Sequence, residues 1–128
     1  MLDTGALLAI ERRDRVLRSR LTAAIDAGEP EVLLLAPVIA QAWRGGSGRQ
    51  APLARFLASP ALVTLDLTVA QARRVGELLA RSGTIDVTDA ACALLASDRR
   101  RATVLTSDPG DLSRLRTSCE HPFAIEAV

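Results

Sequence analysis

The stretch GTIDVTDAACALLASDRRRATVLTSDPGD, residues 83–111, decides how this chain folds. Its alanine-rich middle predicts a helix over residues 87–100, and the apolar run that follows predicts a strand at 102–106. Aspartates stand where this helix opens and where this strand ends: Asp86, Asp89, Asp108 and Asp111. Helices that alternate with short apolar strands are typical of α/β proteins with a parallel sheet.

The same alternation extends through the rest of the chain. We expect strands at 32–36, 62–65, 102–106 and 123–126, and helices at 15–27, 38–44, 51–58, 69–82, 87–100 and 111–115. Leu2 and Asp3 predict a first strand that is either very short or only partly contained in this sequence, and a helix that begins at Gly5. The length suits one domain, so we predict a single domain over residues 1–128.

Capping residues mark the ends of two of these helices. Asp14 and Thr68 suit N-caps, and Gly28 and Gly83 suit the position after the last turn. The periodicity turns these residues toward the core: Leu17, Leu21, Ala24, Ile25, Val69, Ala72, Val75, Leu78 and Leu79. The glycine-rich break at 45–48 separates two short helices, which we expect to pair as a helical hairpin.

Composition limits what kind of protein this is. Apolar residues make up 48% and charged residues 24%, the balance of a soluble globular protein. All 16 cationic residues are arginine and the formal net charge is +1, so no overall positive field indicates a nucleic-acid partner. Cys92 and Cys119 lack a C-x-x-C spacing, and Cys92 is expected to be a buried thiol in a reducing compartment. The apolar runs are too short for a membrane span, which favours a cytoplasmic protein.

Acids accompany three separate elements of the predicted sheet: Asp3, then Asp86 with Asp89, then Asp108 with Asp111. The carboxyl ends of parallel strands face one crevice, so acids that are distant in sequence can converge there. Converging carboxylates repel each other unless a cation lies between them, and Mg²⁺ fits that role. Each aspartate also suits an ordinary role as a cap or turn residue, with Asp111 expected to cap the last helix. The metal-site hypothesis therefore depends on their co-location.

Three short motifs, taken in order, resemble those of a known family. They are Leu2-Asp3-Thr4, then residues 86–90, DVTDA, and residues 106–112, TSDPGDL. With these motifs at these separations, the chain resembles PIN-domain ribonucleases, specifically the VapC-type toxins of bacterial toxin–antitoxin pairs. The likeness runs from Met1 to about Leu115. It implies a PIN-like, three-layer α/β/α fold with a mostly parallel central sheet.

The resemblance also implies a metal site. Asp3, Asp89 and Asp108 match the family's catalytic carboxylates, which would hold Mg²⁺ or Mn²⁺. Asp86 and Asp111 are nearby acids that could bind the same metal. Gln41 stands where the family has a glutamate, and an amide oxygen can ligate a cation without adding negative charge.

Other residues have supporting roles in this reading. Thr4 and Ser107 lie beside predicted ligands and could orient a carboxylate or a water molecule. Arg44 and Arg49 flank the glycine-rich break and could hold RNA phosphates. His121, before a proline in a loop, is expected to be exposed and not catalytic.

The family likeness leads to two functional hypotheses. The first is a metal-dependent endoribonuclease toxin that cleaves RNA and is neutralised by a cognate antitoxin. The alternative is a catalytically weakened PIN-like module that binds RNA or the antitoxin without efficient cleavage, and Gln41 is its best support. A homodimer is expected, and Trp43 and Phe56 on the two short helices are candidates for the homodimer or antitoxin interface.

Overall fold

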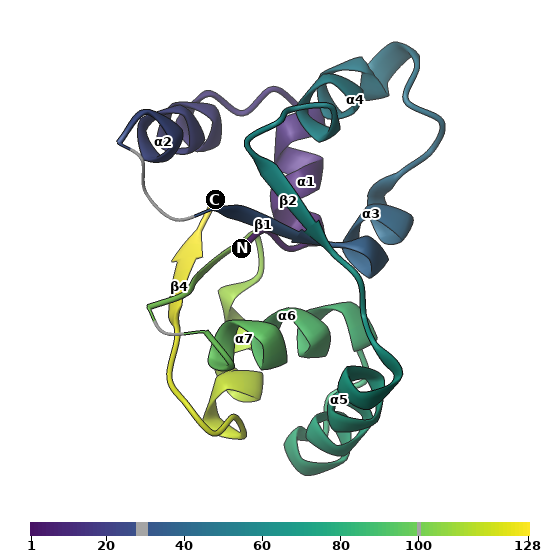
Figure 1. Cartoon of the computed structure of the whole chain (residues 1–128), viewed down its shortest axis with the longest axis vertical. Helices are drawn as coiled ribbons and strands as arrows, with labels where there is room; N and C mark the ends of the chain where they lie inside the picture. The colour runs from purple at the N-terminus through teal and green to yellow at the C-terminus, as the bar shows by residue number, and fades with distance from the viewer. Residues whose placement is uncertain (28–30, 100) are drawn as a thin grey trace.

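A computed structural model describes residues 1–27, 31–99 and 101–128 of the chain (Figure 1). Its helices are α1 (Thr4–Glu11), α2 (Arg15–Asp26), α3 (Ala36–Ala42), α4 (Ala51–Leu57), α5 (Val69–Ser82), α6 (Val87–Ser97) and α7 (Pro109–Thr117). A 3₁₀ turn, η1 (Gly48–Gln50), precedes α4. The strands are β1 (Val32–Leu35), β2 (Leu62–Leu65), β3 (Thr103–Thr106) and β4 (Ala124–Ala127). The predicted α/β class is confirmed.

All of these strand pairs are parallel. β1 pairs with β2, and β3 pairs with β4. Leu2 lies between the two pairs and bridges Leu34 on one side and Leu105 on the other, so the order across the sheet is β2, β1, Leu2, β3, β4. Its amide donates to the Leu33 carbonyl at 3.0 Å. The first strand is therefore reduced to a single bridging residue, and Asp3 leaves the centre of the sheet immediately after it.

Helices cover the sheet on both sides. Figure 1 shows α1 to α4 at one end of the view and α5 to α7 at the other, with the strands between them. Every residue of α6 from Ala90 to Ser97 is buried, because this helix packs against α5, α7 and β3 together. Small alanine side chains allow such close approach, so the alanine-rich stretch forms the central helix of one layer.

Local signals explain most helix boundaries. Asp14 caps α2, and Thr68 caps α5 in a capping box with Gln71. Gly83 adopts a left-handed φ of 68° and ends α5, as predicted. The predicted stop at Gly28 lies outside the described residues, as does residue 100, the expected end of the helix that begins at Val87. That helix, α6, ends at Ser97.

Several boundary predictions were wrong by one or two residues, including the helix expected from Gly5, which begins at Thr4, and the bounds of α3, β4 and α7. α3 begins two residues before the predicted start because Ala36 and Pro37 form its first turn, and β4 starts one residue late. α7 runs from Pro109 to Thr117, longer than the predicted turn at 111–115. Its cap is Asp108 and not Asp111, because the backbone at Asp108 is still outside the helix and Pro109 suits the first helical position.

Two packing predictions were also wrong. The helices on either side of the glycine-rich break do not form a hairpin, since α3 and α4 each pack on α1. Three residues expected to face the core are exposed: Ile25, Val69 and Ala72. Val69 and Ala72 lie in the first turn of α5, ahead of the part that reaches α6, and Ile25 faces a groove described below.

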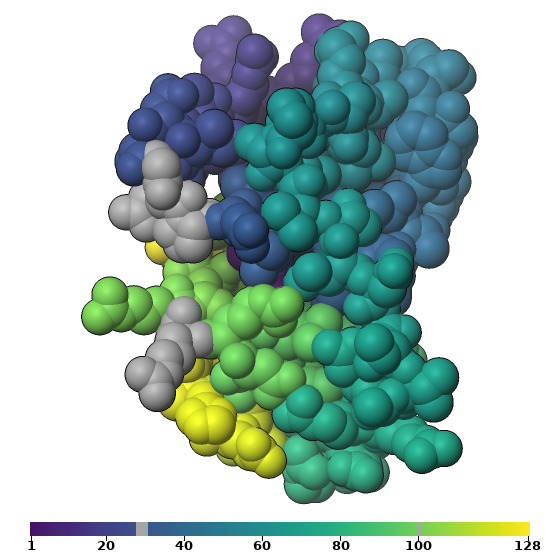
Figure 2. Space-filling model, in the orientation of Figure 1, coloured from purple at the N-terminus to yellow at the C-terminus, as the bar shows by residue number. Residues whose placement is uncertain are grey.

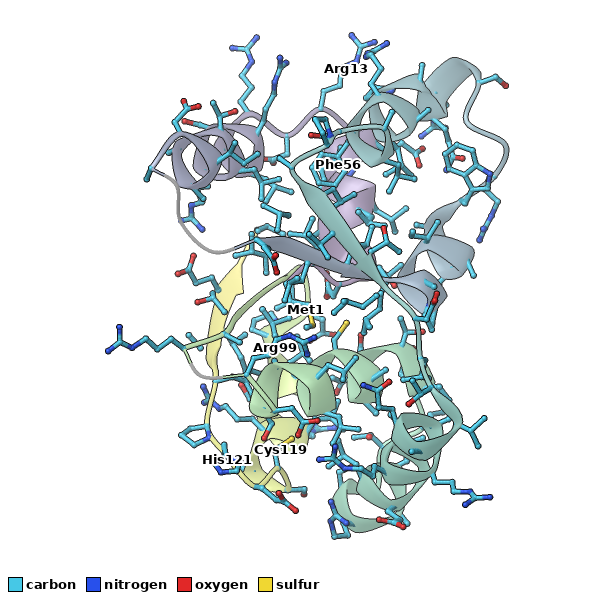
Figure 3. All side chains as sticks on the ribbon, viewed as in Figure 1. Met1, Arg13, Phe56, Arg99, Cys119 and His121 are labelled. Carbon is cyan, nitrogen blue, oxygen red and sulfur yellow. The ribbon has the colours of Figure 1, made fainter. Side chains whose placement is uncertain are left out.

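Other sequence-based expectations can be compared with the structure. Cys92 is fully buried, which confirms the predicted buried thiol, and Cys119 is half-buried; both are free. His121 is exposed, as expected, and Figure 3 shows it at the end of the molecule opposite Arg13. Within the described ranges, no helix is both long and apolar enough to cross a membrane.

Candidate active site

Asp3 is the most deeply placed acid of the candidate site. It follows the bridging residue Leu2 and caps α1, and only 4% of it is exposed. Its Oδ1 accepts the Ala6 amide at 2.7 Å. Burial raises the pKa of this carboxyl, while hydrogen bonds from the Thr106 side chain and from the amides of Ala6 and Gly5 oppose the rise. Burial thus disfavours the ionised form of Asp3, and a bound cation would favour it.

Two more acids come from the start of α6. Asp86 caps this helix, and its Oδ1 accepts the amides of Thr88 at 2.8 Å and Asp89 at 2.9 Å. Asp89 lies in the first turn, partly buried. Burial raises the pKa of Asp89 to about 6, and the charges of Asp86, Asp3, Asp111 and Asp108 add to the rise in that order. Asp89 therefore carries negative charge that its surroundings do not compensate.

The end of β3 supplies the last two acids. Asp108 is exposed and caps α7, and its Oδ1 accepts the Gly110 amide at 3.1 Å. Its own amide donates to the hydroxyl of Thr106 at 2.8 Å. Asp111, in the first turn of α7, is about half exposed and forms an ion pair with Arg114 at 3.5 Å. Thr106 thus links the backbone of Asp108 to the carboxylate of Asp3, a role that the sequence analysis missed although Thr106 ends the predicted strand.

Gly5 allows the first turn of α1 to lie close to the end of β3. A Cβ atom at this position would lie 2.0 Å from the Ser107 Oγ and 2.9 Å from its backbone nitrogen. No side chain fits in that space, so glycine is required here for steric reasons and not for its φ. Asp3 lies two residues before Gly5, and Asp108 directly follows Ser107. The close contact between Gly5 and Ser107 therefore holds both acids at the same edge of the sheet.

The five acids share one electrostatic neighbourhood. Each of the other four raises the pKa of Asp89, and Asp108 also raises that of Asp3. Of these five acids, only Asp111 forms an ion pair within residues 1–27, 31–99 and 101–128, and its partner is Arg114. In the same part of the chain, no three acidic, histidine or cysteine side chains are already arranged around a point that could hold a metal ion. The acids are therefore brought together, but their side chains are not closed around a common centre.

Gln41 and Thr4 lie beside this cluster. Gln41 is exposed on α3, and the hydroxyl of Thr4 donates to its Oε1. Thr4 directly follows Asp3, so this hydrogen bond places the Gln41 amide next to the acid site. The two predicted auxiliary residues thus contact each other, and Ser107 contacts the helix that Thr4 begins through its approach to Gly5.

The predicted RNA-binding arginines follow α3. Both Arg44 and Arg49 are exposed. A buried glutamine, Gln50, orders their loop: its Nε2 donates to the Ala42 carbonyl at 2.8 Å and to Glu11 at 3.1 Å, and its Oε1 accepts the Arg44 amide. No local pattern predicts this role, because a glutamine beside a glycine-rich break resembles any surface residue. Trp43 is 38% exposed, so it is not a core residue.

A groove away from the acids was not predicted. It lies between α1, α2 and α4, encloses about 490 Å³, and has mainly apolar walls that include Ile10, Leu21, Ile25 and Phe56. Its lining also includes the arginines Arg13, Arg18 and Arg55. Figure 2 shows the surface indented between α2 and α4, and Figure 3 places Phe56 and Arg13 at this end of the molecule, away from Met1.

Comparison with known proteins identifies the fold family. A family model for the PIN domain matches residues 1–117, most of the chain. The chain belongs to the PIN domain family. PIN domains are nuclease-type proteins that typically depend on divalent metal ions. No curated protein and no solved structure matches the chain.

The residues of this PIN domain suit a divalent cation in kind and in charge. Carboxylate oxygens are the ligands that hard cations prefer, and the pKa of Asp89 is raised first by burial and then by the charges of the four other acids, both of which a bound cation would oppose. At Asp3, Asp86 and Asp108, the hydrogen bonds of the cap use Oδ1. Each carboxylate has a second oxygen besides the one that the cap uses, so the donor set suits a metal in kind once the side chains turn toward a common ion.

Proposed function

We propose that this PIN domain is a metal-dependent endoribonuclease toxin that cleaves RNA and is neutralised by a cognate antitoxin. The observation that carries the proposal is the coupling of Asp3, Asp89 and Asp108, drawn from three separate elements to one sheet edge. Carboxylates that lie close together without a cation destabilise a folded protein. Their presence here therefore supports a functional role.

The proposed chemistry is hydrolysis of a phosphodiester bond. A bound Mg²⁺ or Mn²⁺ would polarise the phosphate and acidify a water molecule. Asp3, Asp89 and Asp108 would hold the ion, with Asp86 and Asp111 adding negative charge nearby. Because the pKa of Asp89 is about 6 without metal, this carboxyl changes protonation close to neutral pH, and cation binding would favour its ionised form. Arg44 and Arg49 would hold flanking phosphates of the RNA.

The alternative is a PIN-like module that binds RNA or the antitoxin without efficient cleavage. Gln41 favours it, because the amide lacks the charge of the glutamate found at this position in the family. The restoring substitution Gln41→Glu separates the two possibilities. An inert wild-type protein that becomes a nuclease with Gln41→Glu would be the weakened module.

The groove between α1, α2 and α4 supports a protein partner. Its apolar walls suit the apolar face of a peptide helix, and Arg13, Arg18 and Arg55 suit acidic side chains on that peptide. We therefore propose this groove as the antitoxin contact, with Phe56 as its aromatic anchor. Trp43, which is exposed and is not among the residues that line this groove, is the candidate anchor for a homodimer.

A cleavage assay tests the proposed activity. Purified protein should cut end-labelled structured RNA in Mn²⁺ and not in EDTA, and Asp3→Asn or Asp89→Asn should abolish cleavage. Asp66→Asn is the matched control, since Asp66 is an exposed acid after β2 and is not one of the five. Cleavage that persists in EDTA or in both site variants would indicate a contaminating nuclease and count against the proposal.

A further inference from the structure

The side chain of Gln41 is held in a particular orientation by its neighbour. The Thr4 hydroxyl donates its hydrogen to Oε1 of Gln41. The two residues are 37 positions apart in sequence, on α1 and α3, and the contact lies directly beside Asp3. Thr4 is itself half-buried in the first turn of α1, so the amide of Gln41 is tied to the rigid start of a helix.

This hydrogen bond decides which atom of the Gln41 amide faces Thr4. The amide oxygen is the only atom of the side chain that can ligate a cation, and the hydrogen bond from Thr4 already takes one of its two lone pairs. The Nε2 group has two N–H donors and no lone pair to give to a metal. None of the hydrogen bonds found within the described part of the chain uses Nε2 of Gln41. Besides the second lone pair of its oxygen, Gln41 therefore has a pair of donors to offer at the site.

The five acids are acceptors when they are ionised, and the only basic partner among the described residues, Arg114, is bound to Asp111. A phosphodiester brought to this edge would meet carboxylates that repel it. A neutral amide can donate to a phosphate oxygen without competing with the cation for the carboxylates.

We propose that Gln41 binds a non-bridging phosphate oxygen of the nucleic acid through Nε2, with Thr4 as the positioning residue, and does not ligate the metal. This inference rests on the proposed nuclease function, because it concerns the substrate of the same site. With glutamine in place of glutamate at position 41, the site would gain a hydrogen bond to phosphate and lose one negative charge beside the metal.

Two separate titrations test the assignment. Mn²⁺ affinity is measured by calorimetry on the protein alone, and RNA affinity by fluorescence anisotropy with a 2′-O-methyl oligonucleotide, which is not cleaved. Gln41→Ala should weaken oligonucleotide binding about tenfold, the effect of one hydrogen bond to a charged group, and leave Mn²⁺ affinity unchanged. Gln41→Glu should do the reverse, binding Mn²⁺ more tightly and the oligonucleotide more weakly.

Variants of Thr4 test the positioning role. Thr4→Val keeps the shape but removes the hydroxyl, so it should weaken oligonucleotide binding as Gln41→Ala does, whereas Thr4→Ser should retain wild-type affinity. Ala40→Glu is the matched control for added charge, because Ala40 is exposed on the same helix. Circular dichroism melting of each variant without metal checks that it is folded.

The outcomes separate this inference from the function on which it rests. Wild-type protein that binds neither Mn²⁺ nor the oligonucleotide would refute the proposed function itself. Wild-type protein that binds both, together with a Gln41→Ala variant that loses Mn²⁺ and keeps the oligonucleotide, would make Gln41 a metal ligand and overturn the inference alone. A Gln41→Ala variant that loses neither would also overturn it.

Discussion

Asp89 provides a direct test of how strongly the acids of this site are coupled. Burial and the charges of its acidic neighbours raise its pKa from an ordinary value of 3.8 to about 6. A tenfold change in acidity corresponds to about 1.4 kcal/mol, so the ionised form costs the native state at most about 3 kcal/mol. Because solvent screens a partly exposed charge, we expect Asp89→Asn to stabilise the metal-free protein by about 1–2 kcal/mol near neutral pH.

The pH dependence of this gain has a definite sign. Folded Asp89 keeps its proton up to about pH 6, whereas in the unfolded chain it loses the proton near 3.8. Between these values the native state binds more protons than the unfolded state, so this group makes wild-type stability fall as the pH rises from about 4 to about 6. The Asn variant lacks this titration. Its advantage should be absent near pH 4 and fully present above pH 6.

Urea denaturation in EDTA across this pH range measures the free energy of unfolding for both proteins. Asp66→Asn, which removes an exposed acid outside the cluster, should show no such pH-dependent gain. Adding Mn²⁺ at neutral pH should then stabilise the wild type by mass action and the Asp89→Asn variant much less. An Asn variant that gains no stability, or gains it equally at every pH, would refute the raised pKa of Asp89.

Three further predictions concern the surroundings of the site. Gly5→Ala should destabilise the protein by about 1–3 kcal/mol in urea denaturation, because its Cβ would clash with Ser107, and adding Ser107→Gly should recover part of the loss. Asp108→Ala should cost about 1 kcal/mol more than Asp108→Asn in the same assay, since asparagine still caps α7, while both should weaken Mn²⁺ binding in calorimetry. In a thiol-labelling assay on folded protein, Cys119 should react and Cys92 should not, because full burial raises the pKa of Cys92 and blocks access; equal labelling would contradict the buried position of Cys92.

The sequence contained enough to predict the elements, because their signals are local. The strand at 62–65 and the helix between Thr68 and Gly83 were predicted with the observed bounds, since alternation, capping and a left-handed glycine act within a few residues. The gathering of acids at one edge followed from parallel strands alone. Their roles as ligands remain a prediction, because no three of the described side chains are arranged around a common point that could hold an ion.

Features that depend on distant parts of the chain were missed or wrong. The groove requires α1, α2 and α4 to leave space between them, and no periodicity in one helix encodes this. The pairing of α3 with α4 failed because α1 offers both of them a better surface. Likewise, the contact between Thr4 and Gln41 joins residues that no local rule connects, yet it fixes which atom of the amide binds Thr4.

Capping and metal binding do not exclude each other at this edge of the sheet. Asp3, Asp86 and Asp108 each give one carboxylate oxygen to the amides of the helix that they open. The partial positive charge of a helix N-terminus favours an ionised carboxylate, so three helix starts help to hold together charges that otherwise repel. Asp89 accepts no such hydrogen bond from the described residues, and its pKa shows the large rise. The three caps therefore stabilise the site without metal, and Asp89 is the position where a cation changes the balance of charge most.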